Sequence, residues 1–323
     1  MKIAIVGGGN VYALNFARHL DKIGVDHFGI GRSGPKESAF WQINHHYRYH
    51  KLHLVAMLQA ILAVLDTERP DVIVNFAAQG EGAASFAENA HYFYETNTLS
   101  LVRFAEECRR REFIKRFVQI SSSEVYGSVD KVAKETDLLN PTSPYSVSKA
   151  AFDQHLMILS RLGLMNGVNI IRPTNAYCPG QQPHRIIPMA IIAALSGRKL
   201  KLHGGGQAEK SYMHADDLSQ AIMTVLTLGE AGRVYNVGPD EPIKIRYLVA
   251  KVAEACGVAF DDLVENAGER VGQDARYWLD TSAIKLLGWR TETSLTKGVA
   301  GMVEWVTAHP ELLAMDTTFR IRP

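Results

Sequence analysis

The sequence has 323 residues, 46% of them hydrophobic and 21% charged, which is enough to bury the core of one large domain or two smaller ones. Its formal net charge of +1 gives no electrostatic reason to expect nucleic acid or an anionic membrane as a partner. Three widely spaced cysteines argue against a disulfide framework and favour a reducing compartment. The longest apolar stretch, Ile186–Leu195, is too short to span a bilayer, and no signal peptide is recognised. We therefore expect a cytoplasmic protein.

Apolar runs alternate with helix-like segments through the first half of the chain. Lys2–Val6 is expected to form a buried strand, followed by a helix over Asn10–Ile23 with Val11, Leu14 and Ala17 on one face. In chain order, the next expected elements are a strand at 26–30, a helix at 55–65, a strand at 71–76, a helix at 97–111, a strand at 116–120, a helix at 146–161 and a strand at 168–172. This alternation predicts an α/β fold with a Rossmann-type, doubly wound parallel sheet.

Beyond Arg172 the pattern becomes less regular. Four prolines and a glycine run predict a loop-rich stretch (Pro173, Pro179, Pro183, Pro188 and 204–206). Helices are expected again at 216–228, 245–256 and 294–307, with a strand at 233–237. We expect a dinucleotide-binding domain over residues 1–175, to which 216–238 returns. A smaller, mostly C-terminal α/β substrate domain is expected over 176–215 and 239–323.

A glycine-rich turn joins the first strand to the first helix. Gly7, Gly8 and Gly9 would let a dinucleotide pyrophosphate approach bare backbone and helix N-terminal amides. In the G-x-x-G-x-x-G register the second position is Asn10, which can adopt left-handed geometry but whose side chain intrudes on the phosphate. The third position is Ala13, which still allows close helix packing. The alternative is a tight turn without a ligand.

The end of the second strand carries no carboxylate for the adenosine ribose. Arg32 and Ser33 stand there instead. Because a guanidinium grips phosphate oxygens in a fork, this pair favours a 2′-phosphate, and hence NADP over NAD. The alternative is an arginine at an exposed strand end.

Tyr145 and Lys149 carry the strongest functional signal. Four residues apart on a helix, they share one face, where a protonated lysine lowers the pKa of a phenol and lets it act as a base. Residues 121–124 (SSSE) follow the strand at 116–120 and place hydroxyls and a carboxylate where open α/β sheets bind ligands. Together these features predict a nicotinamide-dependent enzyme.

Over nearly its whole length the sequence resembles the extended short-chain dehydrogenases/reductases that modify nucleotide sugars. Four segments are similar to that family's motifs: 121–127 (SSSEVYG) to S-[ST]-x-x-V-Y-G, 175–179 (NAYCP) to N-x-Y-G-P, 212–217 (YMHADD) to F-I-H-V-D-D, and 286–289 (LLGW) to L-G-W. Within the family the likeness is greatest to dTDP-glucose 4,6-dehydratases, through residues 95–97, 183–188 and 270–276.

The sequence departs from those dehydratases at several positions. Ser123 and Glu124 replace an aspartate–glutamate pair and look like the pair of GDP-mannose 4,6-dehydratases and UDP-glucuronate decarboxylases. Lys210 stands where many relatives have a phosphate-binding arginine, and Lys51 where many have an adenine-binding aspartate. Cys178 replaces a glycine.

The resemblance implies a tightly bound NADP or NAD that is recycled within one catalytic cycle, and no metal. It implies a catalytic set of Tyr145, Lys149, Ser122, Glu124 and Ser123. The implied cofactor-binding set is Gly7, Gly9, Asn10, Val11, Arg32, Ser33, Ala77, Ala78, Gln79, Asn97, Tyr145 and Lys149. The implied substrate-binding set is Asn175, Arg185, Lys210, Arg270 and Arg276.

The expected reaction is 4,6-dehydration of a nucleotide-diphosphate sugar. Because Ser123 is a poor acid, a 4-epimerase, a decarboxylase or a 4-oxidase of the same family remains an alternative, and a non-catalytic NADP-binding sensor or scaffold is the non-enzyme alternative. The resemblance also implies a homodimer that pairs the helices at 97–111 and 146–161 as a four-helix bundle. The apolar positions Ala151, Leu156 and Leu159 fit this interface or burial in the chain's own core.

Overall fold

The computed structural model describes residues 1–34, 47–80, 89–268 and 274–317. Its main element is a parallel sheet of seven strands in the described chain, in the order β11-β6-β5-β4-β1-β2-β3. The strands are β1 (Lys2–Val6), β2 (Asp26–Gly31), β3 (Tyr49–Lys51), β4 (Val72–Asn75), β5 (Arg116–Ile120), β6 (Val168–Pro173) and β11 (Arg233–Val237). The order doubles back at β1, so the doubly wound α/β fold expected from the sequence is confirmed.

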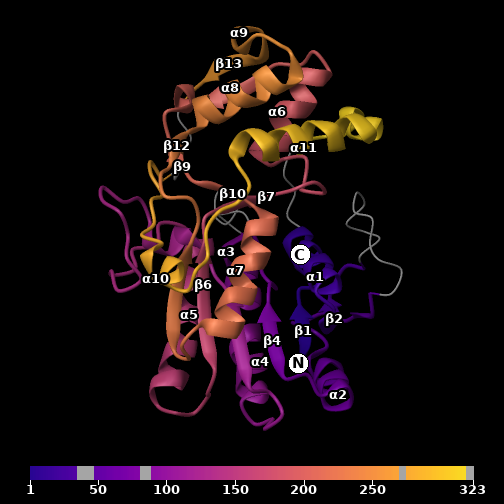
Figure 1. Ribbon diagram of the computed structural model, residues 1–323, viewed down its shortest axis with the longest axis vertical. Helices are drawn as coiled ribbons and strands as arrows, with labels where there is room; N and C mark the ends of the chain where they lie inside the picture. Colours follow the sequence, from indigo (N-terminus) through magenta and orange to yellow (C-terminus); the bar gives the residue numbers. More distant parts are fainter. Residues whose placement is uncertain (35–46, 81–88, 269–273, 318–323) are drawn as a thin grey trace.

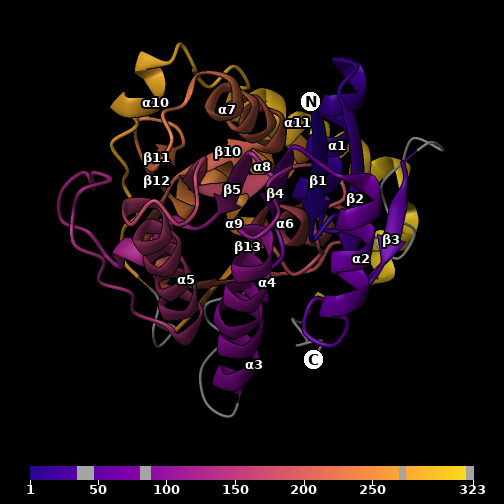
Figure 2. The same cartoon turned by 90° about the horizontal axis from the view of Figure 1, so that it is seen from below.

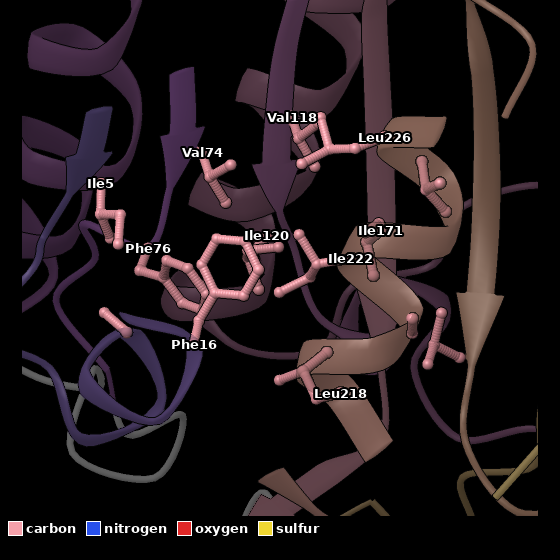
Figure 3. Close-up of a cluster of buried hydrophobic side chains, with 14 of the residues drawn as sticks. Ile5, Phe16, Val74, Phe76, Val118, Ile120, Ile171, Leu218, Ile222 and Leu226 are labelled. Atoms are coloured by element: carbon pink, nitrogen blue, oxygen red, sulfur yellow. The ribbon is translucent and has the colours of Figure 1, made fainter. Parts of the chain in front are cut away.

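Helices cover both faces of this sheet (Figure 2). One face carries α1 (Val11–Lys22) and α7 (Ala215–Leu228), and the other carries α2 (Leu58–Glu68), α4 (Leu101–Cys108) and α5 (Pro144–Arg161). Side chains alternate between the faces, so Ile3 and Ile5 belong to the first core while Ala4 and Val6 belong to the second. Burial on both faces explains why inner strands such as β1 and β4 are nearly continuous apolar runs. Figure 3 shows the first core, where Phe16 of α1 packs with side chains of β1, β4, β5, β6 and α7.

A smaller lobe sits beyond the carboxyl ends of the strands, at the top of Figure 1. Its core joins α6 (Ile186–Leu195), α8 (Ile245–Cys256) and α11 (Leu295–Ala308) with the pair formed by β8 (Leu200–His203) and β13 (Val264–Ala267). The remaining elements are α9 (Phe260–Leu263), η6 (Gly204–Gly206), η7 (Pro310–Ala314) and two further pairs, β7 (Asn175–Tyr177) with β10 (Tyr212–His214) and β9 (Glu209–Lys210) with β12 (Ile243–Lys244). Cavities between such a lobe and a sheet edge are usual ligand sites.

The chain returns to the sheet after entering the second lobe. β11 pairs with β6 in parallel register, and α7 packs on the first core. Ile284, on α10 (Ser282–Leu286), and Trp289 also belong to that core, although both come from the stretch expected in the substrate domain.

Some elements differ from the sequence-based expectations. The helix expected from 55 begins at Leu58, and the helix expected from 97 continues α3 (Ala90–Tyr94) through a π-helical segment, η4 (Glu95–Ser100). The expectation of a loop-rich stretch around Pro188 is wrong, because α6 forms there. Pro188 lies in the first turn of α6, where a backbone N–H has no helical partner to lose. Among the described residues, no helix is both long and apolar enough to cross a membrane. The cytoplasmic location stays a prediction.

Candidate active site

One cavity of about 1060 Å³ runs along the carboxyl ends of β1, β2, β4, β5 and β6 and up to α6. This is the edge where open α/β sheets bind ligands. Its walls include most of the residues selected from the sequence: Gly7, Gly9, Asn10, Val11, Arg32, Ser33, Ala77, Ala78, Gln79, Ser122, Glu124, Tyr145, Lys149, Asn175, Arg185 and Lys210. Most of the expected cofactor and catalytic groups therefore line a single cavity.

The glycine-rich turn after β1 lines the cavity. Gly7 has φ +77°, and a Cβ there would lie 2.4 Å from the backbone nitrogen of Ala77. A Cβ on Gly9 would lie 2.4 Å from the carbonyl oxygen of Ser33. Asn10 does not adopt the left-handed geometry open to it; its backbone is extended and its Oδ1 accepts from Tyr12 N at 2.9 Å, capping α1. Bare backbone and a helix N-terminus thus face the cavity, as a pyrophosphate requires.

The adenosine end of the expected cofactor site is formed by the turn after β2. Arg32 is exposed and lines the cavity beside Ser33. The Ser33 carbonyl accepts a hydrogen bond from the Tyr49 hydroxyl of β3, which holds this turn against the sheet. Arg32 therefore stands at the cavity rim, with its side chain accessible to an anionic group.

Asn97 has a different place from the other expected cofactor residues. It is fully buried on η4 and is not among the cavity-lining residues. Its side chain accepts from Gln79 N at 2.7 Å and donates to Gln79 O at 2.9 Å and to Ser148 Oγ at 3.0 Å. Asn97 thus fixes the loop after β4, including Ala77 and Ala78, to the helix that carries Tyr145.

The N-terminus of α5 places the tyrosine–lysine pair. Ser143 caps α5 through a reciprocal bond with Ser146, and Pro144 is the first helical residue, so Tyr145 lies in a fixed first turn. Lys149 is 2% exposed and donates from Nζ to the Ile120 carbonyl at 2.8 Å. Burial lowers the pKa of Lys149 to about 8, while Asp153 raises it. Near neutral pH the lysine is therefore mostly protonated, and its charge favours the phenolate of Tyr145.

The turn after β5 divides its serines between the cavity and the interior. Ser122 lines the cavity and caps η5 (Ser123–Tyr126), accepting from Glu124 N at 3.2 Å. Glu124 lines the same cavity. Ser123 is 3% exposed and is not among the lining residues. A hydroxyl and a carboxylate thus face the site, with Ser123 between them turned inward.

A second group of polar side chains, around Lys210, also borders the cavity. Lys210 donates from Nζ to the Asp274 carbonyl at 2.7 Å and lies 3.3 Å from the ring centroid of Tyr277. Asp274 accepts from Tyr277 Oη at 2.7 Å and from Thr142 Oγ1 at 2.8 Å. Burial lowers the pKa of Lys210 to about 8, although Asp274 and Glu124 raise it. Asp274 and Tyr277 line the cavity, but sequence reasoning did not select them as site residues.

The other residues expected to bind the substrate do not all line the cavity. Asn175 and Arg185 line the cavity, and Arg185 is the N-cap residue of α6. Arg276 is paired with Glu209 and is not among the lining residues. Arg270 lies outside the described residues.

Comparison with known proteins identifies the family. The model of the NAD dependent epimerase/dehydratase family matches residues 3–238. The chain belongs to this family. Its members are enzymes, so the motif-based resemblance is confirmed at the family level and the sensor alternative loses its support.

Several curated relatives are similar at modest identity. The chain is 33% identical over 263 residues to the Arabidopsis thaliana trifunctional UDP-glucose 4,6-dehydratase/UDP-4-keto-6-deoxy-D-glucose 3,5-epimerase/UDP-4-keto-L-rhamnose-reductase RHM3, covering 80% of this chain and 39% of that protein. The chain thus spans about two fifths of that relative's length. It is 33% identical over 239 residues to dTDP-glucose 4,6-dehydratase of Streptomyces niveus, covering 73% and 69% of the two chains.

Solved structures share the whole architecture. The crystal structure of DesIV, a dTDP-glucose 4,6-dehydratase of Streptomyces venezuelae with NAD bound, superposes with a TM-score of 0.87 at 28% identity, covering 96% of this chain and 98% of that one. UDP-glucose 4-epimerase of Thermotoga maritima superposes with a TM-score of 0.88 at 22% identity, covering 96% and 100%. At that identity the epimerase likeness concerns the fold alone.

Proposed function

We propose that the chain is a nucleotide-sugar 4,6-dehydratase. The observation that carries the proposal is that Glu124, Ser122, Tyr145 and Lys149 all line one cavity. Ser122, Tyr145 and Lys149 suit oxidation at a sugar C4. The carboxylate of Glu124 in the same cavity suits removal of the acidified C5 proton. The likeness to 4,6-dehydratases in plant and bacterial relatives supports the same reaction.

Each residue then has a defined task. Tyr145, as phenolate, takes the proton of the sugar O4, while Lys149 lowers the phenol pKa and Ser122 orients O4. A nicotinamide bound in this cavity would supply the oxidising equivalent for C4 and the hydride that C6 later receives, with a solvent-derived proton added at C5. Glu124 removes the C5 proton, whose loss leaves an enolate next to the 4-ketone. The bare-backbone turn at Gly7 and Gly9 fits the pyrophosphate of such a dinucleotide.

The departure of the C6 hydroxyl needs a proton. A serine is a poor acid near neutral pH, and Ser123 is buried away from the cavity. Glu124 holds the former C5 proton at that moment. Passing it to the leaving hydroxide releases water and regenerates the carboxylate, so one residue completes the elimination.

The cofactor and the diphosphate are assigned by charge. Arg32 at the cavity rim supports NADP over NAD, because a guanidinium can take the 2′-phosphate. Lys210 and Arg185 from two different elements suit the substrate diphosphate, which needs more than one cation in a partly closed site.

A second copy of the chain is the proposed occupant of the exposed face of α5. Val147, Ala151, Ile158 and Leu162 lie on this face, with exposures of 37% for Val147, 47% for Ile158 and 66% for Leu162. Leu156 and Leu159, by contrast, belong to the chain's own core. An apolar stripe with spacings of four and seven residues suits a four-helix interface.

A nucleotide-sugar panel tests the reaction. Purified protein is incubated with GDP-, UDP-, CDP- and dTDP-hexoses, and the products are weighed by mass spectrometry. A 4,6-dehydratase yields a product lighter by one water. An unchanged mass with altered stereochemistry would replace the proposal by an epimerase, and loss of carbon dioxide from a uronate would replace it by a decarboxylase.

A further inference from the structure

A buried ion pair lies behind the catalytic helix, and none of the steps above uses it. Asp153, one turn after Lys149 on α5, is fully buried. Its Oδ2 accepts from Arg172 Nε of β6 at 3.0 Å and from Ser121 Oγ at 2.8 Å. Arg172 is 2% exposed. Because burying two charges costs stability that a well-packed apolar pair would not, the pair calls for a functional explanation.

Asp153 connects the segments that hold the reacting groups. Ser121 directly precedes Ser122 at the end of β5, and Asp153 fixes its hydroxyl. Lys149 donates to the carbonyl of Ile120, the last residue of the same strand. Displacing Asp153 would therefore disturb the serine turn and the lysine together.

The other oxygen of Asp153 has no hydrogen-bond partner. Oδ1 is buried and receives no donor. An unpaired buried carboxylate oxygen is costly unless a nearby positive charge compensates it. Lys149 stands four residues earlier, on the same face of α5, and the two groups interact electrostatically. Asp153 thus acts on the lysine through its charge and not through a hydrogen bond.

We propose that Asp153 is a positioning residue that keeps Lys149 protonated in its buried position, and that Arg172 holds the Asp153 carboxylate in place. The catalytic part of this proposal rests on the proposed function. Burial alone lowers the pKa of Lys149, and Asp153 opposes this. Burial also raises the pKa of Asp153, but Arg172, Lys149 and Ser121 all favour its ionised form.

Other charged groups surround this arrangement. The Arg172 guanidinium also donates a hydrogen bond to the hydroxyl of Tyr126 on η5, at 2.8 Å. That hydroxyl in turn donates to the side-chain oxygen of Asn236 on β11. Glu135 accepts from the backbone of Asn236 and interacts with both Arg172 and Tyr126. Tyr145 on α5 and Glu124 on η5 face the cavity side. From η4, Asn97 reaches α5 through Ser148 and is uncharged. Asp153 is the carboxylate whose interaction raises the pKa of Lys149.

Direct titration of Lys149 tests the proposal without any sugar. Lysines labelled with carbon-13 at Cε are titrated by NMR, with the Lys149 signal assigned by its loss in K149R. We expect D153N, which keeps the shape but not the charge, to lower the pKa of Lys149 by about one unit or more. D153E keeps the charge, and S121A removes only one hydrogen bond, so both should shift the pKa by less than half of that amount. An unchanged pKa in D153N would overturn the proposal.

The pH dependence of kcat/KM distinguishes a positioning role of Asp153 from a purely structural one. Deprotonating Lys149 raises the pKa of Tyr145, so in D153N the acid limb of kcat/KM should move to higher pH. The double variant D153N/R172Q removes both charges and should bring the Lys149 titration back toward the wild-type value. A uniform loss of rate with unmoved limbs would reject the proposal. If D153N does not fold, the comparison of D153N/R172Q with R172Q replaces it, because these two variants differ only in the charge at position 153; equal Lys149 pKa values in the two would overturn the proposal. Failure of wild-type turnover would instead reject the proposed function and leave the NMR result standing.

Discussion

Replacing Lys149 by methionine should stabilise the fold while abolishing turnover. The lysine is 2% exposed, and burial lowers its pKa from 10.5 to about 8. Holding its charge at neutral pH therefore costs about 3 kcal/mol, at roughly 1.4 kcal/mol per pKa unit. Methionine removes this cost but leaves the Ile120 carbonyl without its donor, at about 1 kcal/mol. The net expectation is a gain of about 2 kcal/mol in the free energy of unfolding at pH 7.

The pH dependence gives the sharper signature. Below about pH 8, Lys149 is protonated in both the folded and the unfolded chain, so its penalty is constant. Between about 8 and 10.5 only the unfolded chain keeps the proton, so wild-type stability rises with pH relative to K149M. The advantage of the variant should shrink by about 3 kcal/mol across this window and reverse at its upper end.

Urea unfolding of both proteins at a series of pH values from 7 to about 10.5 measures this difference, since the subtraction cancels groups common to both chains. Lys131 is exposed, so K131M is the matched control and should follow the wild-type curve. A difference between wild type and K149M that is independent of pH would refute the assignment of a depressed lysine pKa.

Three further predictions concern the proposed function. E124Q should stop the incorporation of solvent deuterium at C5 of the product, measured by NMR; continued incorporation would remove Glu124 from the base role. R32A should weaken NADP binding about tenfold and leave NAD binding within about twofold, because one charge-assisted contact to phosphate is lost; equal weakening of both cofactors would contradict the 2′-phosphate assignment. I158K should convert a dimer to a monomer in light scattering, whereas L286K, which alters an exposed leucine on α10, should not; a dimer that persists in I158K would refute the α5 interface.

Sequence pattern was sufficient for the elements with strong periodicity. Three predicted elements agree with the structure residue for residue: the strands at Lys2–Val6 and Arg233–Val237 and the helix at Ile245–Cys256. Their apolar runs and amphipathic periods are visible within a short stretch of sequence. The strands β7, β9, β10 and β12 are two or three residues long, too short for any period to be visible. The helix α6 was missed because of Pro188. A proline indicates a helix break unless it is known to lie in the first turn.

The site divides in the same way. Tyr145, Lys149 and Glu124 were selected because their spacing or their place after a strand is a local property. Contacts between distant residues were not predictable, such as the packing of Lys210 on Tyr277. Asn97 was selected as a cofactor contact, which stays a prediction, whereas its hydrogen bonds to the Gln79 backbone, which hold the loop after β4, were not predictable from the motif.

The buried charges explain why local pattern fails where it does. Predictions of burial from sequence place lysine, aspartate and arginine on the surface. In this chain four such residues are buried at or behind the cavity: Lys149, Asp153, Arg172 and Lys210. Burial lowers the pKa of Lys149 and of Lys210, so holding these two charges costs stability. Charges also interact more strongly where water is excluded, which strengthens the electrostatics of the site. Polar residues that contradict their local pattern are therefore the ones to examine first for function in this chain. By that criterion the Asp153–Arg172 pair, which a well-packed apolar pair could replace at lower cost, has the strongest claim to a role beyond folding.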